Sequence, residues 1–382
     1  MDAAIARTVP QIGLVVHALE RTGAPIAALR LAEILARRHG LGFSVFAKEG
    51  GRLRDMAAAI GPVRVTQSGP HRPHIGYRDA LHRAVTALSA APPDALYVHS
   101  LACAEWCEAA ELLDIPVVLH VHELAPLMAE LTRAGRIPEA FGPKLSGLVG
   151  PSEQNLRDAR RRLKSTSTPE LIVPSVIDVN ALREAAALAP PAARNGLGDA
   201  LDWNSAPFAM CGAPTHDKGV DLFIAAARQR PDQPFVWIGA LQEGLDDHPA
   251  VAAALAERPP NLYATGRTSR VAAALARSRA LLLSSRADSN PLVLAEAMAL
   301  GVPVAAHARA LGATELVERF GRLLDGRPDA AGLLEVVDDA DGLARMTAGL
   351  TEPKTLAAMD KQLGAENALA DLAKMLRGAA AR

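Results

Sequence analysis

Short apolar runs alternate with amphipathic segments along almost the whole chain, and this alternation constrains the fold more than any other feature. The runs are nearly continuous, as in ALYVH (95–99) and ALLLSS (280–285). The segments between them, such as APIAALRLAEILARR (24–38), repeat apolar residues at three- and four-residue spacing, which is typical of helices. Strands that are apolar on both faces are expected in a parallel sheet covered by helices on both sides. The sequence therefore predicts an α/β fold with doubly wound parallel sheets.

The expected strands fall into two series, and a segment without a strand pattern separates them. Residues 183–206 contain a Pro-Pro pair and several glycines, which predicts a linker. A chain of 382 residues is also too long for a single hydrophobic core. We expect one Rossmann-like domain over 1–182, a second over 207–352, and a C-terminal helix over 353–382 that crosses back to the first. The strands are expected at 12–17, 43–47, 95–99, 117–122, 147–150 and 171–175, and then at 208–212, 235–239, 262–266, 280–285 and 303–306.

The composition argues against several classes of function. The formal net charge is −1 and aromatic residues make up 3% of the chain, so neither a basic surface nor a stacking platform for nucleic acid is predicted. No apolar run approaches the roughly 20 residues of a membrane helix, and Arg7 and Pro10 interrupt the place where a signal peptide has its apolar core. The three cysteines fit neither a usual zinc pattern nor a disulfide framework. We expect a cytoplasmic protein with reduced thiols.

Two carboxylates stand eight positions apart in LLLSSRADSNPLVLAEAMALGVPVAA (281–306), where a predicted strand passes into a helix. Asn290 suits the N-cap of that helix and Pro291 its first position. Asp288 then lies in the loop at the strand end, and Glu296 lies within the helix. Ligands of doubly wound sheets bind at this end of the strands, and a helix start favours an anion. The segment predicts a phosphate-bearing ligand whose hydroxyl groups are held by the two carboxylates.

A second anion site is expected in CGAPTHDKGVDLFIAAARQ (211–229). The segment runs from a strand end through a glycine-containing loop to a helix with one apolar face, and Asp217 is a suitable N-cap. Lys218 lies at the start of that helix, where its ammonium group would match a diphosphate as a point charge. Gly219 would let the backbone approach the ligand closely.

Two segments of the first domain lie at the same ends of their strands. The segment ERTGAPIAALRLAEILARR (20–38) is a glycine-containing loop that opens a long helix, and HVHEL (120–124) ends a buried strand with His122 and Glu123. His120 lies on the same strand face as His122 and competes with it for a functional role. Histidines at strand ends are often hydrogen-bonded core residues, so the structural and functional interpretations of His122 have equal weight.

Together these motifs resemble retaining glycosyltransferases with two Rossmann-like domains, the GT-B fold, and in particular glycosyltransferase family 4. The family's E-x7-E signature looks like Asp288-x7-Glu296 within NPLVLAEAMALGVPVAA, and its phosphate lysine looks like Lys218 in the KG pair. The family's N-terminal glycine loop looks like Thr22–Gly23–Ala24, and its His-Asp/Glu strand end looks like His122–Glu123.

The resemblance implies a role for each position. Lys218 would balance the leaving diphosphate, Asp288 would lie near the transferred sugar, and His122 would contact the sugar or the acceptor. Glu296 would bind the nucleotide ribose. Further contacts to the donor are implied for Gly23, Ser289, Asn290, Leu292 and, near the base, Gly266. Neither a metal ion nor another cofactor is expected, because preorganised donors and a lysine can stabilise the charge on the leaving group.

Two positions depart from the family pattern. The family usually has an arginine shortly before its lysine, and Ala213 stands there in this chain. Arg286 or Arg267, from neighbouring loops, is the candidate that would supply the missing charge. Asp288 is also one methylene shorter than the usual glutamate.

The expected function is transfer of a sugar from a nucleotide-diphosphate donor to a glycan, lipid-linked or small-molecule acceptor, with retention, in bacterial polysaccharide or glycoconjugate biosynthesis. One alternative is a non-hydrolysing nucleotide-sugar epimerase, and another is a non-catalytic relative that binds nucleotide sugars and acts on a partner protein. The run RRRLK (160–164) is either a solvated helix face or a contact for anionic lipid at the inner face of a membrane.

Overall fold

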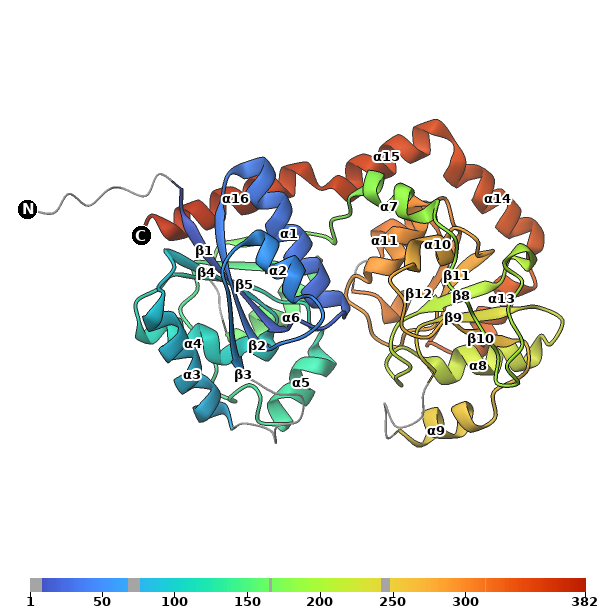
Figure 1. The fold of residues 1–382 in the computed structure, drawn as a ribbon, viewed down its shortest axis with the longest axis horizontal. Coiled ribbons are helices and arrows are strands. Elements are labelled where there is room, and N and C mark those ends of the chain that lie inside the picture. Colours follow the sequence, from blue (N-terminus) through green and yellow to red (C-terminus); the bar gives the residue numbers. More distant parts are fainter. Residues whose placement is uncertain (1–8, 68–75, 165–166, 242–247, 313) are drawn as a thin grey trace, which may run out of the picture. The chain divides into compact units, whose positions relative to one another are not determined.

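The computed structural model describes residues 9–67, 76–164, 167–241, 248–312 and 314–382, and these form two compact α/β units. The first unit comprises Met1–Val176 and Ala365–Arg382, and the second comprises Ile177–Gly364 (Figure 1). Each unit has its own hydrophobic core and its own parallel sheet. The prediction of two doubly wound parallel sheets is confirmed.

The sheet of the first unit has seven strands in the order β3-β2-β1-β4-β5-β6-β7, all of them parallel. Neighbouring residues of β1 enter opposite layers: Leu14 joins the core on one face of the sheet and Val15 the core on the other. Both faces are therefore buried, as the continuous apolar runs predict. The strands are β1 (Gln11–Ala18), β2 (Gly42–Glu49), β3 (Val63–Gln67), β4 (Ala95–His99), β5 (Val117–His120), β6 (Gly147–Gly150) and β7 (Glu170–Ile172).

Helices and one 3₁₀ turn of the first unit connect successive strands, and the last helix comes from the C-terminus of the chain. In chain order they are α1 (Gly23–His39), α2 (Arg54–Ile60), α3 (Tyr77–Ala90), η1 (Leu101–Cys103), α4 (Ala104–Leu112), α5 (Ala125–Arg133), α6 (Glu153–Leu163) and α16 (Glu366–Ala380).

The sheet of the second unit has six parallel strands in the order β10-β9-β8-β11-β12-β13. They are β8 (Phe208–Cys211), β9 (Phe235–Ile238), β10 (Leu262–Ala264), β11 (Ala280–Leu283), β12 (Val304–His307) and β13 (Arg322–Leu324). The helical elements are α7 (Val179–Ala186), η2 (Trp203–Ser205), α8 (Val220–Gln229), α9 (Pro249–Ala256), α10 (Val271–Leu275), α11 (Leu292–Ala299), η3 (Ala308–Ala310), α12 (Glu315–Phe320), α13 (Ala330–Val337), α14 (Ala340–Thr351) and α15 (Pro353–Gly364).

Residues 183–206, expected to form a linker, instead pack on the second unit. Ala193 and Leu201 are buried in its core, and Arg194 pairs with Ala264 at the edge strand β10. The boundary between the units falls after Val176. The Pro-Pro pair interrupts regular structure there, but the apolar side chains that follow still find a surface to bury against.

The expected C-terminal helix is two helices. Ala365, with a φ of 45°, separates α15 in the second unit from α16 in the first. Helix α16 buries Leu369, Leu372 and Leu376 against the first core, so the chain ends on the unit in which it began (Figure 1). No helix in the described ranges is long and apolar enough to cross a membrane.

Two edge strands, β3 and β13, were not predicted. All five residues of β3 are half-buried, and only one of the three residues of β13 is fully buried, so neither strand shows a continuous apolar run. Several predicted strands also end earlier, β5 at His120, β10 at Ala264 and β11 at Leu283.

Candidate functional site

The order of the strands places the switch point of the second sheet between β8 and β11. Both β9 and β10 lie on one side of β8, whereas the chain continues from β11 toward the other edge of the sheet. In a doubly wound sheet, ligands bind beyond the carboxyl ends of the strands at this switch point. The loops that follow β8 and β11, residues 212–219 and 284–291, are the two segments in which the sequence predicts anion binding.

The loop after β8 is held against the loop after β11 by its backbone. Gly219 has a φ of 65° and is the N-cap of α8. A β-carbon at this glycine would lie 2.0 Å from the carbonyl oxygen of Ser284, so only glycine fits. The Ser284 hydroxyl donates to the carbonyl of Lys218 over 2.8 Å. Asp217, the predicted N-cap, is therefore wrong for that role: the left-handed turn at Gly219 starts the helix two residues later.

Lys218 and Asp288 meet at this switch point. The lysine ammonium group donates to a carboxylate oxygen of Asp288 and forms an ion pair with it. The Asp288 side chain is 12% exposed and that of Lys218 33% exposed, so the acid is the more buried partner. The Ser285 hydroxyl lies 3.5 Å from the same carboxylate. The sequence predicts both residues at a donor site, and the structure brings their charged groups into contact.

The backbone of Asp288 is held by the segment that follows β12. Its amide donates to the carbonyl of Ala310 over 2.7 Å, and its carbonyl accepts from the amide of Gly312 over 2.8 Å. These two bonds form an isolated parallel bridge between Asp288 and Leu311. Both backbone polar groups of Asp288 are therefore held by residues 310–312, which limits the movement of its carboxylate.

Glu296, on α11, acts electrostatically on the end of β8. Burial and, to a smaller extent, the charge of Glu296 raise the pKa of the Cys211 thiol to about 12, while the charge of Lys218 lowers it. Both charges therefore lie close enough to the end of β8 to act on the same thiol. Glu296 itself is half-buried and has an interaction partner.

The start of α11 differs by one position from the prediction. Pro291, with a φ of −66° and a ψ of 126°, is the N-cap, so Asn290 is wrong for that role and Leu292 is the first helical residue. The first amides of a helix have no acceptor within it, so the amide N–H of Leu292 makes no hydrogen bond inside α11. Ser289 and Asn290 lie in the loop that precedes it, and both are half-buried.

Arg286 contacts the protein itself. Its guanidinium group donates to both carboxylate oxygens of Asp221, over 2.8 and 2.6 Å, and to the carbonyl of His216 over 2.6 Å. Burial alone would raise the pKa of Asp221, but the contact with Arg286 outweighs it and the pKa is lowered. A direct contact of Arg286 with the sugar donor, as predicted, would require its two hydrogen bonds to Asp221 to break. Arg267, the other candidate, is exposed.

Gly266, predicted near the nucleotide base, follows β10 with a φ of 66° and has open space where a β-carbon would stand. The hydroxyl of Thr265 beside it accepts from the amide of Gly239 over 3.1 Å and donates to the carbonyl of Gly266 over 2.8 Å. These bonds join the loops that follow β9 and β10.

The first unit gathers a second group of polar side chains at the carboxyl ends of its strands. His99 ends β4, and His120 ends β5 directly opposite it in register. His122 follows β5, and its imidazole stacks on that of His120 with the ring centres 4.3 Å apart. Burial lowers the pKa of all three imidazoles. The sequence predicted His120 and His122 as candidates but not His99, because its approach to them depends on the pairing of β4 with β5.

The loop after β5 is fixed by α6. The side-chain amide of Asn155 donates to the carbonyls of His122 and Glu123, over 3.2 and 3.1 Å. The Glu123 carboxylate accepts from the hydroxyl of Ser100 and from the amide of His122. Gly23, by contrast, is the exposed first residue of α1, with open space around it.

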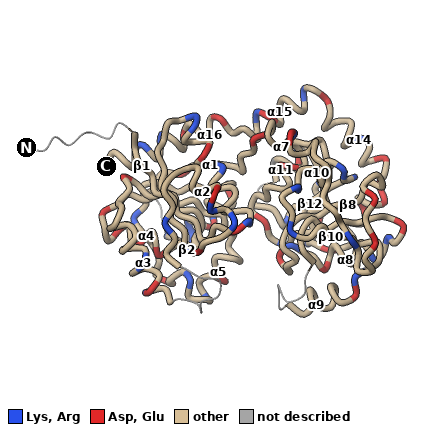
Figure 2. Tube along the Cα trace, viewed as in Figure 1, with Lys and Arg blue, Asp and Glu red and all other residues tan. Residues whose placement is uncertain are grey.

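Charged residues of both signs are interspersed over both units (Figure 2). Two arginines of the basic run on α6 contact the protein itself. Arg160 pairs with Glu153 and Glu170 over 2.9 and 3.5 Å, and Arg162 donates to the carbonyl of Pro138 over 2.6 Å. The positive charge of Arg160 is therefore balanced by neighbouring glutamates.

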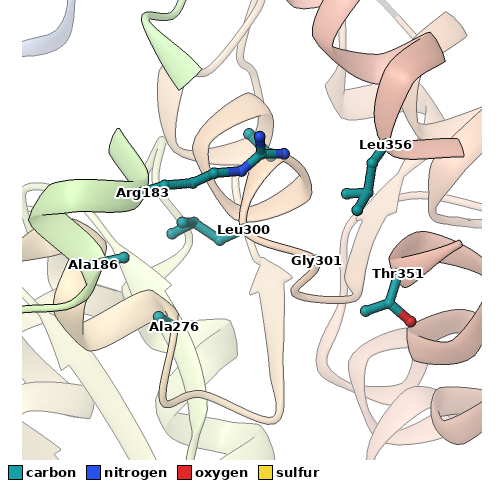
Figure 3. Close-up of a pocket in the computed structure, with 8 residues that line it drawn as sticks. Arg183, Ala186, Ala276, Leu300, Gly301, Thr351 and Leu356 are labelled. Atoms are coloured by element: carbon teal, nitrogen blue, oxygen red, sulfur yellow. The ribbon is translucent and has the colours of Figure 1, made fainter. Parts of the chain in front are cut away.

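A hollow of about 360 Å³ lies elsewhere on the second unit (Figure 3). It is at the C-terminal end of α11, the end remote from Leu292, and small or apolar residues line most of it. The lining residues are Arg183, Ala186, Ala276, Ala299, Leu300, Gly301, Thr351 and Leu356. It contains none of the predicted site residues.

Comparison with solved structures defines the class of fold. Anabaena Alr3699/HepE, in complex with UDP-glucose, superimposes with a TM-score of 0.74 at 17% identity over 97% of this chain and 100% of its own. The sucrose-phosphate synthase of Thermosynechococcus elongatus gives 0.70 at 16% identity, over 97% and 98% of the two chains. A UDP-GlcNAc 2-epimerase from Neisseria meningitidis, bound to UDP-GlcNAc, gives 0.59 at 13% identity, over 95% and 100%. The fold is that of the GT-B class.

The sequence of the second unit is similar to one family of proteins. Residues 204–361 match the family model of glycosyl transferases group 1. The matched range includes Lys218, Asp288 and Glu296 and excludes His122 and Gly23. None of the curated protein sequences matches the chain.

Proposed function

We propose that this protein transfers a sugar from a nucleotide-diphosphate donor to a hydroxyl group of an acceptor. The contact between Lys218 and Asp288 carries the proposal, because it joins a cation and a carboxylate at the switch point of the second sheet. The match of residues 204–361 to glycosyl transferases group 1 supports it independently.

The proposed chemistry follows from charge. Breaking the bond between the sugar and the phosphate develops negative charge on the diphosphate and positive charge at the anomeric carbon. The Lys218 ammonium group and the amides of Ser289, Asn290 and Leu292 would stabilise the diphosphate, because donors fixed before the reaction pay no reorganisation cost during it. The carboxylate of Asp288 would face the sugar.

The remaining roles belong to residues farther from the leaving group. Glu296 would accept hydrogen bonds from the ribose hydroxyls, and the backbone near Gly266 would lie beside the base. In the first unit, His122 would contact the sugar or the acceptor, and Gly23 would add an amide donor. Arg286 would contribute to the donor site by bracing α8 through Asp221.

The ion pair of Lys218 and Asp288 gives this site two arrangements. The lysine neutralises the aspartate when the site holds no donor. A bound diphosphate would compete for the ammonium group and release the Asp288 carboxylate toward hydroxyl groups of the sugar. Donor binding would thereby place the acid where positive charge develops.

We further propose that transfer proceeds with retention of configuration, with a glycan, a lipid-linked molecule or a small molecule as acceptor, in bacterial polysaccharide or glycoconjugate biosynthesis. The protein would work in the cytoplasm, at the inner face of the membrane if its acceptor is lipid-linked. The resemblance of the 281–306 segment to family 4 is the basis for these finer assignments.

A nucleotide screen tests the proposal most directly. The full chain is heated with UDP, GDP, ADP and dTDP and with their sugar conjugates, because a ligand that binds only the folded state raises its melting temperature. UDP-glucose is the first conjugate to test, since the HepE structure contains it. We expect one base to stabilise the protein and its sugar conjugate to release free sugar slowly without an acceptor. A protein that no nucleotide stabilises would contradict the proposal.

A non-hydrolysing epimerase is the second candidate, because the Neisseria epimerase shares the fold. Epimerisation of the donor sugar without any acceptor, followed by NMR, would favour it over transfer. A non-catalytic binding protein is the third candidate, and the alanine at position 213 is the reason to consider it. Donor binding without release or epimerisation of the sugar would favour that candidate.

A further inference from the structure

Three histidines of the first unit converge at the ends of two adjacent strands. His99 and His120 are register partners at the last positions of β4 and β5, and His122 lies two residues beyond. One ring nitrogen from each imidazole can be chosen so that all three lie within 4.8 Å of one another. The three residues are called the histidine triad below.

One distance within the triad is close to that between two ligands of a metal ion. The Nδ1 atom of His99 lies 3.0 Å from the Nε2 atom of His122. Two imidazole nitrogens bound to one tetrahedral Zn²⁺ lie about 3.3 Å apart, given a Zn–N distance of about 2.0–2.1 Å. A small displacement of the rings would therefore replace the hydrogen bond of this pair with two metal–nitrogen bonds.

Two nitrogens of the triad are buried without a partner. The Nε2 atoms of His99 and His120 make no hydrogen bond to any described residue, although the two side chains are only 2% and 3% exposed. An unsatisfied polar atom in a protein interior is costly, so each such atom needs an explanation. A cation bound by Nδ1 of His99 and Nε2 of His122 would supply the missing partner of the Nε2 atom of His120.

A neighbouring tyrosine sets the orientation of His120. The hydroxyl of Tyr97 lies 2.7 Å from its Nδ1 atom and leaves its Nε2 atom directed elsewhere. Metal-bound histidines almost always make a hydrogen bond through the second ring nitrogen, because this bond fixes the ring and the tautomer. Tyr97 occupies that supporting position for His120.

We propose that the histidine triad binds a divalent transition-metal ion of the Zn²⁺ type. Imidazole ligands suit zinc, cobalt, nickel and copper, whereas magnesium and calcium prefer oxygen. His122 is half-buried and provides the route of entry, and a water or an oxygen ligand would complete the coordination on that side. The Glu123 carboxylate beside His122 would offset part of the charge. The triad shares His122 with the proposed contact to the sugar or the acceptor, but no step of the proposed transfer passes through the metal.

Metal titration of the full chain tests this proposal without an activity assay. Purified protein is freed of metal by a chelator and then titrated with Zn²⁺ by calorimetry and with Co²⁺ by visible absorption. We expect one ion to bind per chain, with the intense bands of four-coordinate Co²⁺ and a higher melting temperature with Zn²⁺. Mg²⁺ is expected to give neither effect.

Variants identify the ligands. Tyr97→Phe keeps all three imidazoles and should weaken metal binding about 10- to 100-fold, as for other supporting partners. His122→Ala should weaken metal binding more than Tyr97→Phe does. Because His122 is half-buried, we expect this variant to fold. His82→Ala removes an exposed histidine on α3 and should bind as the wild type does. Failure of the wild type to bind Zn²⁺ saturably, or binding by His122→Ala equal to that of His82→Ala, would overturn the proposal.

Discussion

Lys218 and Asp288, 70 positions apart in the chain, form an ion pair where the loops after β8 and β11 meet. The pair lies at the switch point of the second sheet, the position at which such sheets bind ligands. The predicted phosphate-binding cation and the predicted sugar-binding carboxylate therefore neutralise each other before any donor arrives.

This pairing predicts opposite effects of two substitutions on nucleotide binding. Asp288→Asn keeps the shape of the side chain but removes the charge that competes for Lys218, so the free nucleoside diphosphate should bind as tightly as before or more tightly. Turnover of the sugar donor should still fall. Lys218→Met should weaken nucleotide binding and lower turnover by about 10²- to 10³-fold, the usual cost of one electrostatic contact to a leaving group. Calorimetry and a donor-turnover assay measure both effects, and a tenfold loss of nucleotide affinity in Asp288→Asn would contradict this view of the site.

Gly219 and Gly266 provide a matched pair for backbone strain. Their φ values are 65° and 66°, but a β-carbon at Gly219 would meet the carbonyl oxygen of Ser284 at 2.0 Å, whereas the space at Gly266 is open. Gly266→Ala should cost about 1 kcal/mol of folding free energy from conformation alone. Gly219→Ala should cost about 3 kcal/mol or more, because the two loops must also separate. Urea unfolding compares the two, and equal losses would mean that the loops are not in contact.

Arg286 and Asp221 should act as a unit. Each of Arg286→Met and Asp221→Asn should destabilise the second unit, and the double variant should lose less than the sum by about 1–2 kcal/mol. Because the pKa of Asp221 is lowered in the folded protein, its contribution is present above the ordinary value of 3.8 and is lost as the pH falls through the lowered folded value. The stability difference between wild type and Asp221→Asn should therefore shrink in that acidic range.

The same two variants test whether Arg286 binds the donor directly. If it acts only by bracing α8, both substitutions should reduce donor affinity by similar factors. A large loss with Arg286→Met beside no loss with Asp221→Asn would instead assign Arg286 to the donor.

Cys211 reports on the position of Glu296. The raised pKa of its thiol, to about 12, leaves little thiolate at neutral pH, and the charge of Glu296 contributes to this rise. Glu296→Gln should therefore speed alkylation of Cys211, and Lys218→Met should slow it. Mass spectrometry of the peptide that contains Cys211 follows the rate, with Asp221→Asn as the control. A rate unchanged by Glu296→Gln would place that carboxylate away from the end of β8.

The local pattern of the sequence was sufficient for much of the fold. Strands such as β4 and β8 are continuous apolar runs buried on both faces, so their period and length identify them. The edge strand β3 escaped prediction because its residues are only half-buried and its pattern is mixed. Residues 183–206 were misassigned because proline and glycine mark a break in regular structure but not whether the chain then packs on a core.

The sequence by itself determined the parallel α/β architecture and the loops in which Lys218, Asp288 and Glu296 lie, because period, glycine position and strand ends are local properties. The tertiary structure decided which of these groups touch. The ion pair of Lys218 with Asp288, the fork of Arg286 on Asp221 and the meeting of His99 with His122 each join residues from different strands or loops. Their partners follow from the order of strands in the sheet, which depends on packing over the whole unit and on no single segment of the chain.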